Sequence, residues 1–192
     1  MDKTAKILIV DDGEDKVEIL SRQLKQEGYK ILKAYNAKDA IEIVRKQKLD
    51  LILMDVNMPE MDGFEATRII KKENKTIFLP IIIVTATRDD TEAIVKGLES
   101  GADEYISLPC EKEEMQARVR AMLRTKQLYD KLSQRTRELR EKTQNLERFH
   151  KIVVGRELEM VKLKGEINSL LEKLGQPKKY KVQKTIKGGK NK

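Results

Sequence analysis

The chain has 192 residues, of which 38% are charged and 39% hydrophobic. This length accommodates one ordinary domain with an extension, and it excludes two full domains with separate cores. A single cysteine excludes an internal disulfide and favours a reducing compartment. The longest apolar runs are far shorter than the roughly 20 residues that span a bilayer. We therefore expect a cytoplasmic protein without a signal peptide or a membrane segment.

Charge is unevenly divided along the chain. Residues 1–124 contain 21 basic and 24 acidic side chains, a net charge of −3. Residues 125–192 contain the remaining 19 basic and 8 acidic side chains, a net charge of +11. Any attraction to acidic partners is therefore expected from the C-terminal part alone.

The first part of the chain alternates short apolar runs with amphipathic stretches. The runs predict five strands, at residues 6–10, 30–34, 49–54, 80–85 and 103–106. The stretches between them carry apolar residues at helical spacing: Val17, Leu20 and Leu24 before Gly28; Ala37, Ile41 and Val44; Phe64, Thr67 and Ile70; Ile94 and Leu98 before Gly101. Strands that alternate with helices predict an α/β fold with a doubly wound, five-stranded parallel sheet.

Acidic and hydroxyl side chains follow the predicted strands. Asp11 and Asp12 come directly after the first strand, Asp55 after the third, and Thr85 ends the fourth. In doubly wound sheets, ligands bind beyond the carboxyl ends of the strands. Asp11 and Asp12 could simply favour the start of the next helix. Three carboxylates at one sheet edge, however, repel one another unless a cation compensates, and oxygen ligands of this kind suit Mg²⁺.

Four segments carry a family resemblance: ILIVDD (7–12), LILMDVNMPEMDGFE (51–65), PIIIVTA (80–86) and SGADEYISLP (100–109). In order and spacing they resemble the CheY-like receiver domain of two-component response regulators. The resemblance covers about residues 4–124 and implies a flavodoxin-like fold. It also implies that Asp55 accepts a phosphoryl group from a sensor histidine kinase. Asp12, Asp55 and the backbone carbonyl of Asn57 would bind Mg²⁺ directly, with Asp11 acting largely through water.

The resemblance further implies a conformational switch. Thr85 would hydrogen-bond the phosphoryl oxygens and move toward them, and Tyr105 would change rotamer as Thr85 moves. The physical logic agrees, because an acyl phosphate adds nearly two negative charges and several acceptor oxygens at one point. That change is large enough to bias a two-state loop.

One position departs from the family pattern. Leu108 stands where the family normally has a lysine, immediately before Pro109, and residues 105–110 contain no basic residue. Loss of one charge-assisted contact should cost on the order of 1.5–3 kcal/mol in the phosphorylated state. Two interpretations stay open. In the first, Asp55 is still phosphorylated and the switch is altered; we favour this one because the metal ligands and Thr85 are present. In the second, the domain is a degenerate receiver used for binding.

A different pattern begins after the receiver and continues over residues 125–175. One apolar position recurs every seven residues, at Leu132, Leu139, Leu146, Val153, Met160, Ile167 and Leu174. Its companion position, four residues further on, is mostly polar: Thr136, Thr143, His150, Glu157, Lys164 and Leu171. The heptad spacing predicts a long helix that continues the last receiver helix and forms a parallel coiled-coil homodimer. The alternative is a single amphipathic helix packed back on the receiver.

Residues 176–192 lose the heptad pattern. From residue 177 onward they contain seven lysines and no acidic residue, so we predict a disordered basic tail. Weak, salt-sensitive attraction to nucleic acid is the alternative for this tail.

Three candidate functions follow for the whole chain: a phosphorylation-dependent switch, a coiled-coil adaptor without phosphoryl chemistry, and an accessory nucleic-acid binder. Because no catalytic motif follows the receiver, we do not expect an enzyme.

Overall fold

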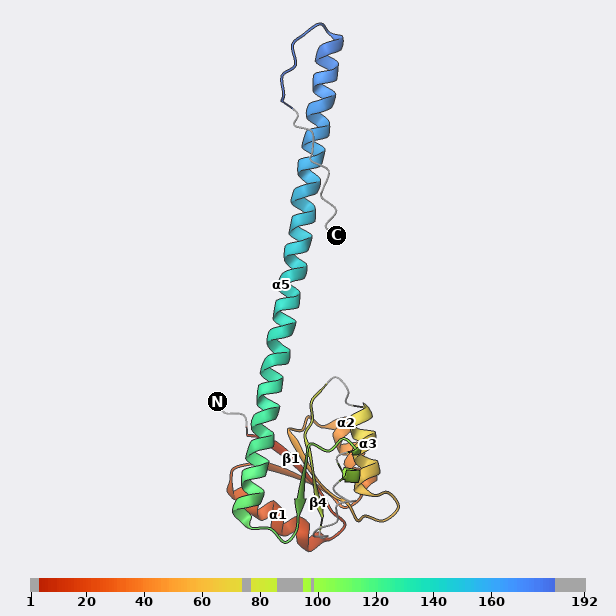
Figure 1. Ribbon diagram of the computed structural model, residues 1–192, viewed down its shortest axis with the longest axis vertical. Helices are drawn as coiled ribbons and strands as arrows, with labels where there is room; N and C mark the ends of the chain where they lie inside the picture. Colours follow the sequence, from red (N-terminus) through yellow and green to blue (C-terminus); the bar gives the residue numbers. More distant parts are fainter. Residues whose placement is uncertain (1–3, 74–76, 86–94, 98, 182–192) are drawn as a thin grey trace. The chain divides into compact units, whose positions relative to one another are not determined.

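The computed structural model describes residues 4–73, 77–85, 95–97 and 99–181. The chain divides into two compact units, Met1–Ser133 and Gln134–Lys192. The first unit contains a sheet and its covering helices, and the second contains most of one long helix (Figure 1).

The sheet has five parallel strands in the order β2-β1-β3-β4-β5. The strands are β1 (Lys6–Val10), β2 (Lys30–Ala34), β3 (Leu51–Asp55), β4 (Ile81–Thr85) and β5 (Glu104–Ser107). The strand order reverses between β1 and β3. In a doubly wound sheet that reversal opens a crevice at the carboxyl ends of the two strands. The predicted α/β fold is confirmed, with β3 reaching Asp55 itself.

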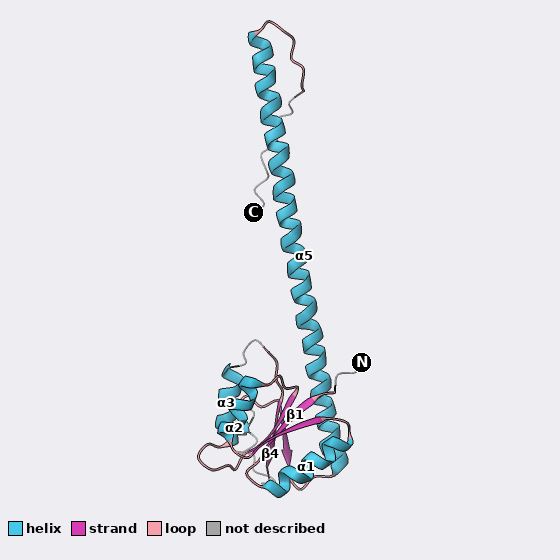
Figure 2. Cartoon of the chain, turned by 180° about the vertical axis from the view of Figure 1, so that it is seen from behind, coloured by secondary structure: helices cyan, strands magenta, loops and turns pink. Residues whose placement is uncertain are grey.

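Helices cover both faces of the sheet (Figure 2). They are α1 (Glu14–Gln26), α2 (Ala37–Lys46), α3 (Gly63–Glu73) and α5 (Lys112–Lys173). Of the helix predicted around Ile94 and Leu98, residues 95–97 and 99 are helical, and Ile94 and Leu98 themselves lie outside the described residues. The predicted stop at Gly101 adopts a positive φ of 93°, a conformation that glycine takes without strain.

Alternation along the strands divides the core into two main clusters. Ile7 and Ile9 pack with residues of α1 and the start of α5, whereas Leu8 and Val10 pack with residues of α2 and α3. Successive side chains of a strand point to opposite faces, so a strand covered on both faces must be apolar throughout. This requirement explains why β1, β3 and β4 are continuous apolar runs, and it places the polar side chains at their ends.

The first turns of α5 belong to the receiver unit. Met115, Val119 and Leu123 are buried in the core beside α1. Further along, the Tyr129 ring lies 5.1 Å from the ring of Phe78, measured between centroids. The compact unit that contains the receiver runs to Ser133, and the receiver boundary at residue 124 stays a prediction.

The second unit is built on the remainder of α5, which continues through Gly155 and Gly165 without a break. Its apolar side chains are exposed at the recurring heptad position: Leu139, Leu146, Val153, Met160, Ile167 and Leu174. After Gly175, at a φ of 72°, the chain turns back, and the Asn168 side chain accepts hydrogen bonds from the backbone N–H groups of Lys179 and Tyr180. The start of the predicted disordered tail is thus held against the helix, and residues 182–192 lie outside the described residues.

None of the helices in the described part of the chain combines the length and the apolar character needed to cross a lipid bilayer.

Replacing Tyr129 with alanine should lower the free energy of unfolding of the receiver unit by about 0.5–1.5 kcal/mol, because the ring contact with Phe78 is lost. Urea unfolding followed through the near-UV signal of the remaining tyrosines would measure this change. Gln127→Ala is the matched control, because that side chain is exposed in the same stretch of α5 and lies off the heptad row. Equal effects of both variants would mean that Tyr129 does not join the extension to the receiver.

Candidate functional site

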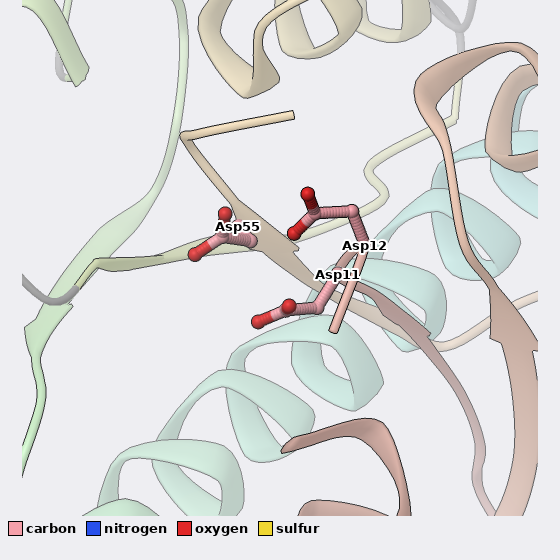
Figure 3. A group of neighbouring side chains, drawn as sticks. All are labelled: Asp11, Asp12 and Asp55. Atoms are coloured by element: carbon pink, nitrogen blue, oxygen red, sulfur yellow. The ribbon is translucent and has the colours of Figure 1, made fainter. Parts of the chain in front are cut away.

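Three carboxylates meet at the point where the strand order reverses (Figure 3). Asp11 and Asp12 directly follow β1, and Asp55 is the last residue of β3. One oxygen from each carboxylate can be chosen so that all three lie within 4.8 Å of one another. Parallel neighbouring strands end at the same edge of the sheet, so this juxtaposition follows from the topology.

The three aspartates differ in exposure and in hydrogen bonding. Asp11 and Asp55 are 2% and 4% exposed, whereas Asp12 is exposed to solvent. The Asp11 Oδ1 atom accepts hydrogen bonds from the Gly13 N–H at 2.8 Å and from the Lys16 Nζ at 3.3 Å. The Asp55 Oδ2 atom accepts one from the backbone N–H of Asn57 at 2.8 Å.

The electrostatics of the site disfavour a charged Asp55. Burial and then the negative charge of Asp11 raise the pKa of the Asp55 carboxyl above its ordinary value. The positive charge of Lys16 and the Asn57 N–H partly oppose this, and Asp12 adds a smaller increase. The site therefore favours anything that brings positive charge to Asp55.

Gly63, the first residue of α3, lies against the backbone of Asp55. A Cβ atom at this position would lie 2.0 Å from the backbone carbonyl oxygen of Asp55, a distance that no side chain tolerates. The Gly63 N–H also donates a hydrogen bond to the Val56 carbonyl at 2.9 Å. Helix α3 can therefore begin directly against the end of β3 only because residue 63 is glycine.

The two predicted switch residues come from neighbouring strands. Thr85 ends β4 and is 1% exposed, and the strand register pairs Asp55 with Val84, the residue before it. Tyr105 lies on β5, where it packs against a small apolar cluster of Val56, Ile83 and Ala102. Residues 86–94, which follow Thr85, lie outside the described residues.

Leu108 is directed into apolar surroundings. Its side chain packs against the core cluster beside α1 and α5, and its N–H donates a hydrogen bond to the Thr85 carbonyl at 2.6 Å. The peptide bond between Leu108 and Pro109 is cis. Together with Lys16, Ile19 and Cys110, Leu108 lines an apolar groove of about 400 Å³ between α1 and the start of α5.

Sequence reasoning missed two residues that shape this site and one contact of a third. Lys16 was not identified as a partner of the carboxylates, and Gly13 was not recognised as a neighbour of Asp11. Asp62 and Gly63 belong to the segment 51–65 that carries the resemblance and were expected to form a turn over the site, but the contact of Gly63 with the Asp55 carbonyl was not predicted. A lysine in the first turn of the helix that follows the acidic pair was the available signal for Lys16. The two glycine contacts become visible only when the loops are folded.

The donor chemistry fits a hard divalent cation. Such ions are bound by carboxylate and carbonyl oxygens, and Mg²⁺ in particular is commonly held by one or two carboxylates together with water. Asp11, Asp12 and Asp55 supply such carboxylates, with one oxygen of each within 4.8 Å of the others.

Comparisons with known proteins decide the family. A family model described as the response regulator receiver domain matches residues 7–120. The chain belongs to this receiver family. It is 39% identical over 119 residues to Protein PilH of Pseudomonas aeruginosa, an alignment that covers 62% of this chain and 98% of PilH.

Solved structures agree. A CheY-like response regulator receiver domain protein from Methanospirillum hungatei superposes with a TM-score of 0.62 and 26% identity, covering 66% of this chain and 99% of that one. The response regulator TrrA of Thermotoga maritima, solved in complex with Mg²⁺ and BeF, gives a TM-score of 0.56 and 29% identity, covering 62% and 99%. The first part of this chain is thus the receiver domain of a two-component response regulator. In this signalling system, receiver domains partner with sensor histidine kinases.

The Asp55→Asn variant should be more stable than the wild type at pH 7 in metal-free buffer. Because the folded-state pKa of Asp55 is raised, the unfolded chain releases this proton first as the pH rises above the ordinary aspartate value. The wild type therefore loses stability as the pH rises from the unfolded-state pKa of Asp55 to its folded-state pKa. The loss is about 1.4 kcal/mol for each tenfold difference in proton affinity between the two states. The advantage of the variant should shrink as the pH falls toward 3, where aspartate is protonated in both states.

Urea unfolding of both proteins between pH 3 and 7 would measure this dependence. Asp50→Asn serves as a control for the removal of an aspartate outside the cluster. A stability difference for Asp55→Asn that does not change with pH would contradict the prediction.

Proposed function

We propose that the chain is a phosphorylated response regulator that accepts a phosphoryl group on Asp55 from a sensor histidine kinase. The observation that carries this proposal is the meeting of three carboxylates at the strand reversal, two of them buried. Buried like charges raise the free energy of the folded state, so a protein that retains them gains from a ligand that offsets their charge.

Mg²⁺ is the ligand that we propose for this cluster. Asp12, Asp55 and the backbone carbonyl of Asn57 would hold it, with Asp11 acting largely through water. Bound there, it would supply the positive charge that offsets repulsion between the Asp55 carboxylate and an incoming phosphoryl group. TrrA, whose structure contains Mg²⁺ and BeF, is a relative in which such ligands occur.

The transfer requires little from the protein beyond positioning. A carboxylate oxygen of Asp55 forms a bond to phosphorus while the phosphorus–nitrogen bond of a phosphohistidine donor breaks. The imidazole nitrogen leaves with the bonding electron pair, and no oxidation or reduction takes place. The Asn57 N–H, which donates to Asp55 Oδ2, leaves the other oxygen available for attack.

Thr85 and Tyr105 are the proposed switch residues. Thr85 ends the strand beside Asp55, so its hydroxyl can hydrogen-bond an acceptor that appears on Asp55. Tyr105 packs in the same cluster as Ile83, two residues before Thr85. A shift of Thr85 toward a phosphoryl group would therefore alter the packing around Tyr105, which would carry the signal to the edge of the sheet at β5.

The proposed output is association of two chains through α5. Leu139, Leu146 and Leu174 are between 64% and 74% exposed, although such side chains normally seek burial. A second row of exposed apolar residues lies three positions after the heptad row, at Phe149, Leu163 and Leu170. Two apolar rows at alternating spacings of three and four residues form the seam of a coiled coil. The seam would therefore contain more apolar residues than the mostly polar position four residues after the heptad row indicated.

A coiled-coil adaptor without phosphoryl chemistry is the second candidate. Leu108 favours it, because this side chain packs in the core and presents no charge to Asp55. The adaptor would keep the exposed helix and lose the switch. The two candidates therefore differ in one measurable event, the phosphorylation of Asp55.

Incubation with acetyl phosphate and Mg²⁺ should add one phosphoryl group, about 80 Da, to the wild-type chain and none to Asp55→Asn. Intact-mass spectrometry would measure the adduct, and the same incubation with chelator is the control for the metal. The expected adduct disappears in both controls, because Asp55 is the acceptor and the carboxylate cluster requires a cation. An unmodified wild-type chain would favour the adaptor.

Leu146→Glu should raise the dissociation constant of the homodimer on the order of 100-fold or more, since each of two buried leucines contributes roughly 1.5–3 kcal/mol. Sedimentation equilibrium over a range of concentrations would measure it, with and without beryllofluoride. Gln144→Glu is the matched control, because it adds the same charge at an exposed position off the heptad row. A wild-type chain that stays monomeric at every concentration would rule out this output.

A further inference from the structure

One cation contacts the carboxylate cluster among the described residues, and it comes from α1. The Nζ atom of Lys16 lies 3.3 Å from the Asp11 Oδ1 atom. Its side chain is 48% exposed, so the ammonium group keeps room to move. Partial burial lowers the pKa of Lys16, but the hydrogen bond to Asp11 and the charges of Asp11, Asp55 and Asp12 outweigh this and raise it. Lys16 therefore stays charged beside the acceptor.

Lys16 supplies a positive charge beside the groove that Leu108 lines with an apolar side chain. Both side chains line the same groove beside α1. Leu108 fills the apolar part of the groove and packs on the core, whereas the end of Lys16 turns toward the aspartates. The site thus has an apolar residue after β5 and a basic residue in the first turn of α1.

Gly13 makes room for this arrangement. A Cβ atom at Gly13 would lie 3.1 Å from Asp11 Oδ1 and 3.6 Å from both Cδ and Cε of Lys16. A larger residue would crowd the Asp11 carboxylate, whereas its contact with the Lys16 stem would be of ordinary van der Waals length. The backbone of Gly13 has a φ of −85°, which any residue adopts, so the fit depends on the small side chain and not on backbone freedom.

We infer that Lys16 is the residue that contacts the phosphoryl group on Asp55, in place of a lysine after β5. This inference rests on the proposed phosphorylation of Asp55. The Asp11 and Asp55 carboxylates offer oxygens within 4.8 Å of each other, and the positive charge of Lys16 already acts on Asp55, so a small movement of this half-exposed side chain suffices for the proposed contact. Lysine suits this role because its charge sits at the end of a flexible four-carbon stem.

The inference makes two predictions of opposite sign. Without a phosphoryl group, Lys16 competes with a metal ion for Asp11, so its removal should strengthen the binding of Mg²⁺ alone. With a phosphoryl group on Asp55, Lys16 adds an attractive contact, so its removal should weaken that state. A lysine that only supports the fold would change both in the same direction, and an ordinary surface ion pair would change neither appreciably.

The test uses the full chain and isothermal titration calorimetry. Lys16→Gln and the control Lys25→Gln, an exposed lysine in the last turn of α1, are each titrated first with Mg²⁺ alone. They are then titrated with beryllofluoride at saturating Mg²⁺. Lys16→Gln should bind Mg²⁺ several-fold more tightly and beryllofluoride at least roughly tenfold more weakly, as expected for the loss of one charge-assisted contact. Lys25→Gln should match the wild type in both titrations.

A rescue variant separates a charge effect from a loss of structure. Adding Leu108→Lys to Lys16→Gln should restore the binding of beryllofluoride, because it places an ammonium group at the position before Pro109, in the groove that residue 16 also lines. Wild-type affinity for beryllofluoride in Lys16→Gln would overturn the role of Lys16 and leave the proposed function intact. Parallel losses of both affinities without rescue would also overturn it. A wild-type chain that binds no beryllofluoride would overturn the proposed function and this inference together.

Discussion

Mutual repulsion among three carboxylates at the rim of the sheet is the constraint on which the site depends. Asp11 and Asp55 are almost fully buried, and their negative charges disfavour each other. The fold holds them together because β1 and β3 are adjacent and parallel, and because an apolar core anchors both strands. The packing of the sheet thus holds the carboxylates together against their mutual repulsion, which a bound cation would reduce.

Three residues around the carboxylate cluster contact Asp11 or Asp55. Lys16 approaches Asp11 from α1, and the Asn57 N–H supports Asp55. Gly63 lets α3 begin against the carbonyl of Asp55, which fixes the end of β3. The contact of Lys16 adds positive charge, the Asn57 N–H adds a hydrogen bond, and Gly63 allows the two backbone segments to approach closely.

The long helix α5 is buried at its start and exposed along the rest of its length. Its first turns bury Met115, Val119 and Leu123 in the receiver core, so they are part of the domain that carries the site. Beyond Ser133 the apolar residues are exposed at a regular spacing. One continuous helix therefore connects a segment buried in the receiver with a segment whose apolar residues are exposed.

The sequence by itself determined the sheet, its parallel strands and the aspartates at their ends, because a strand covered on both faces must be apolar and its functional residues must follow it. It also determined the helix after the receiver through the seven-residue period. Tertiary structure decided which side chains surround Asp55. Residue 16 and residue 108 are far apart in the chain, and only packing of α1 beside the start of α5 places them in one groove. The close approach of Gly63 to Asp55 was equally invisible, because distances across a turn depend on how the chain folds and not on its spacing.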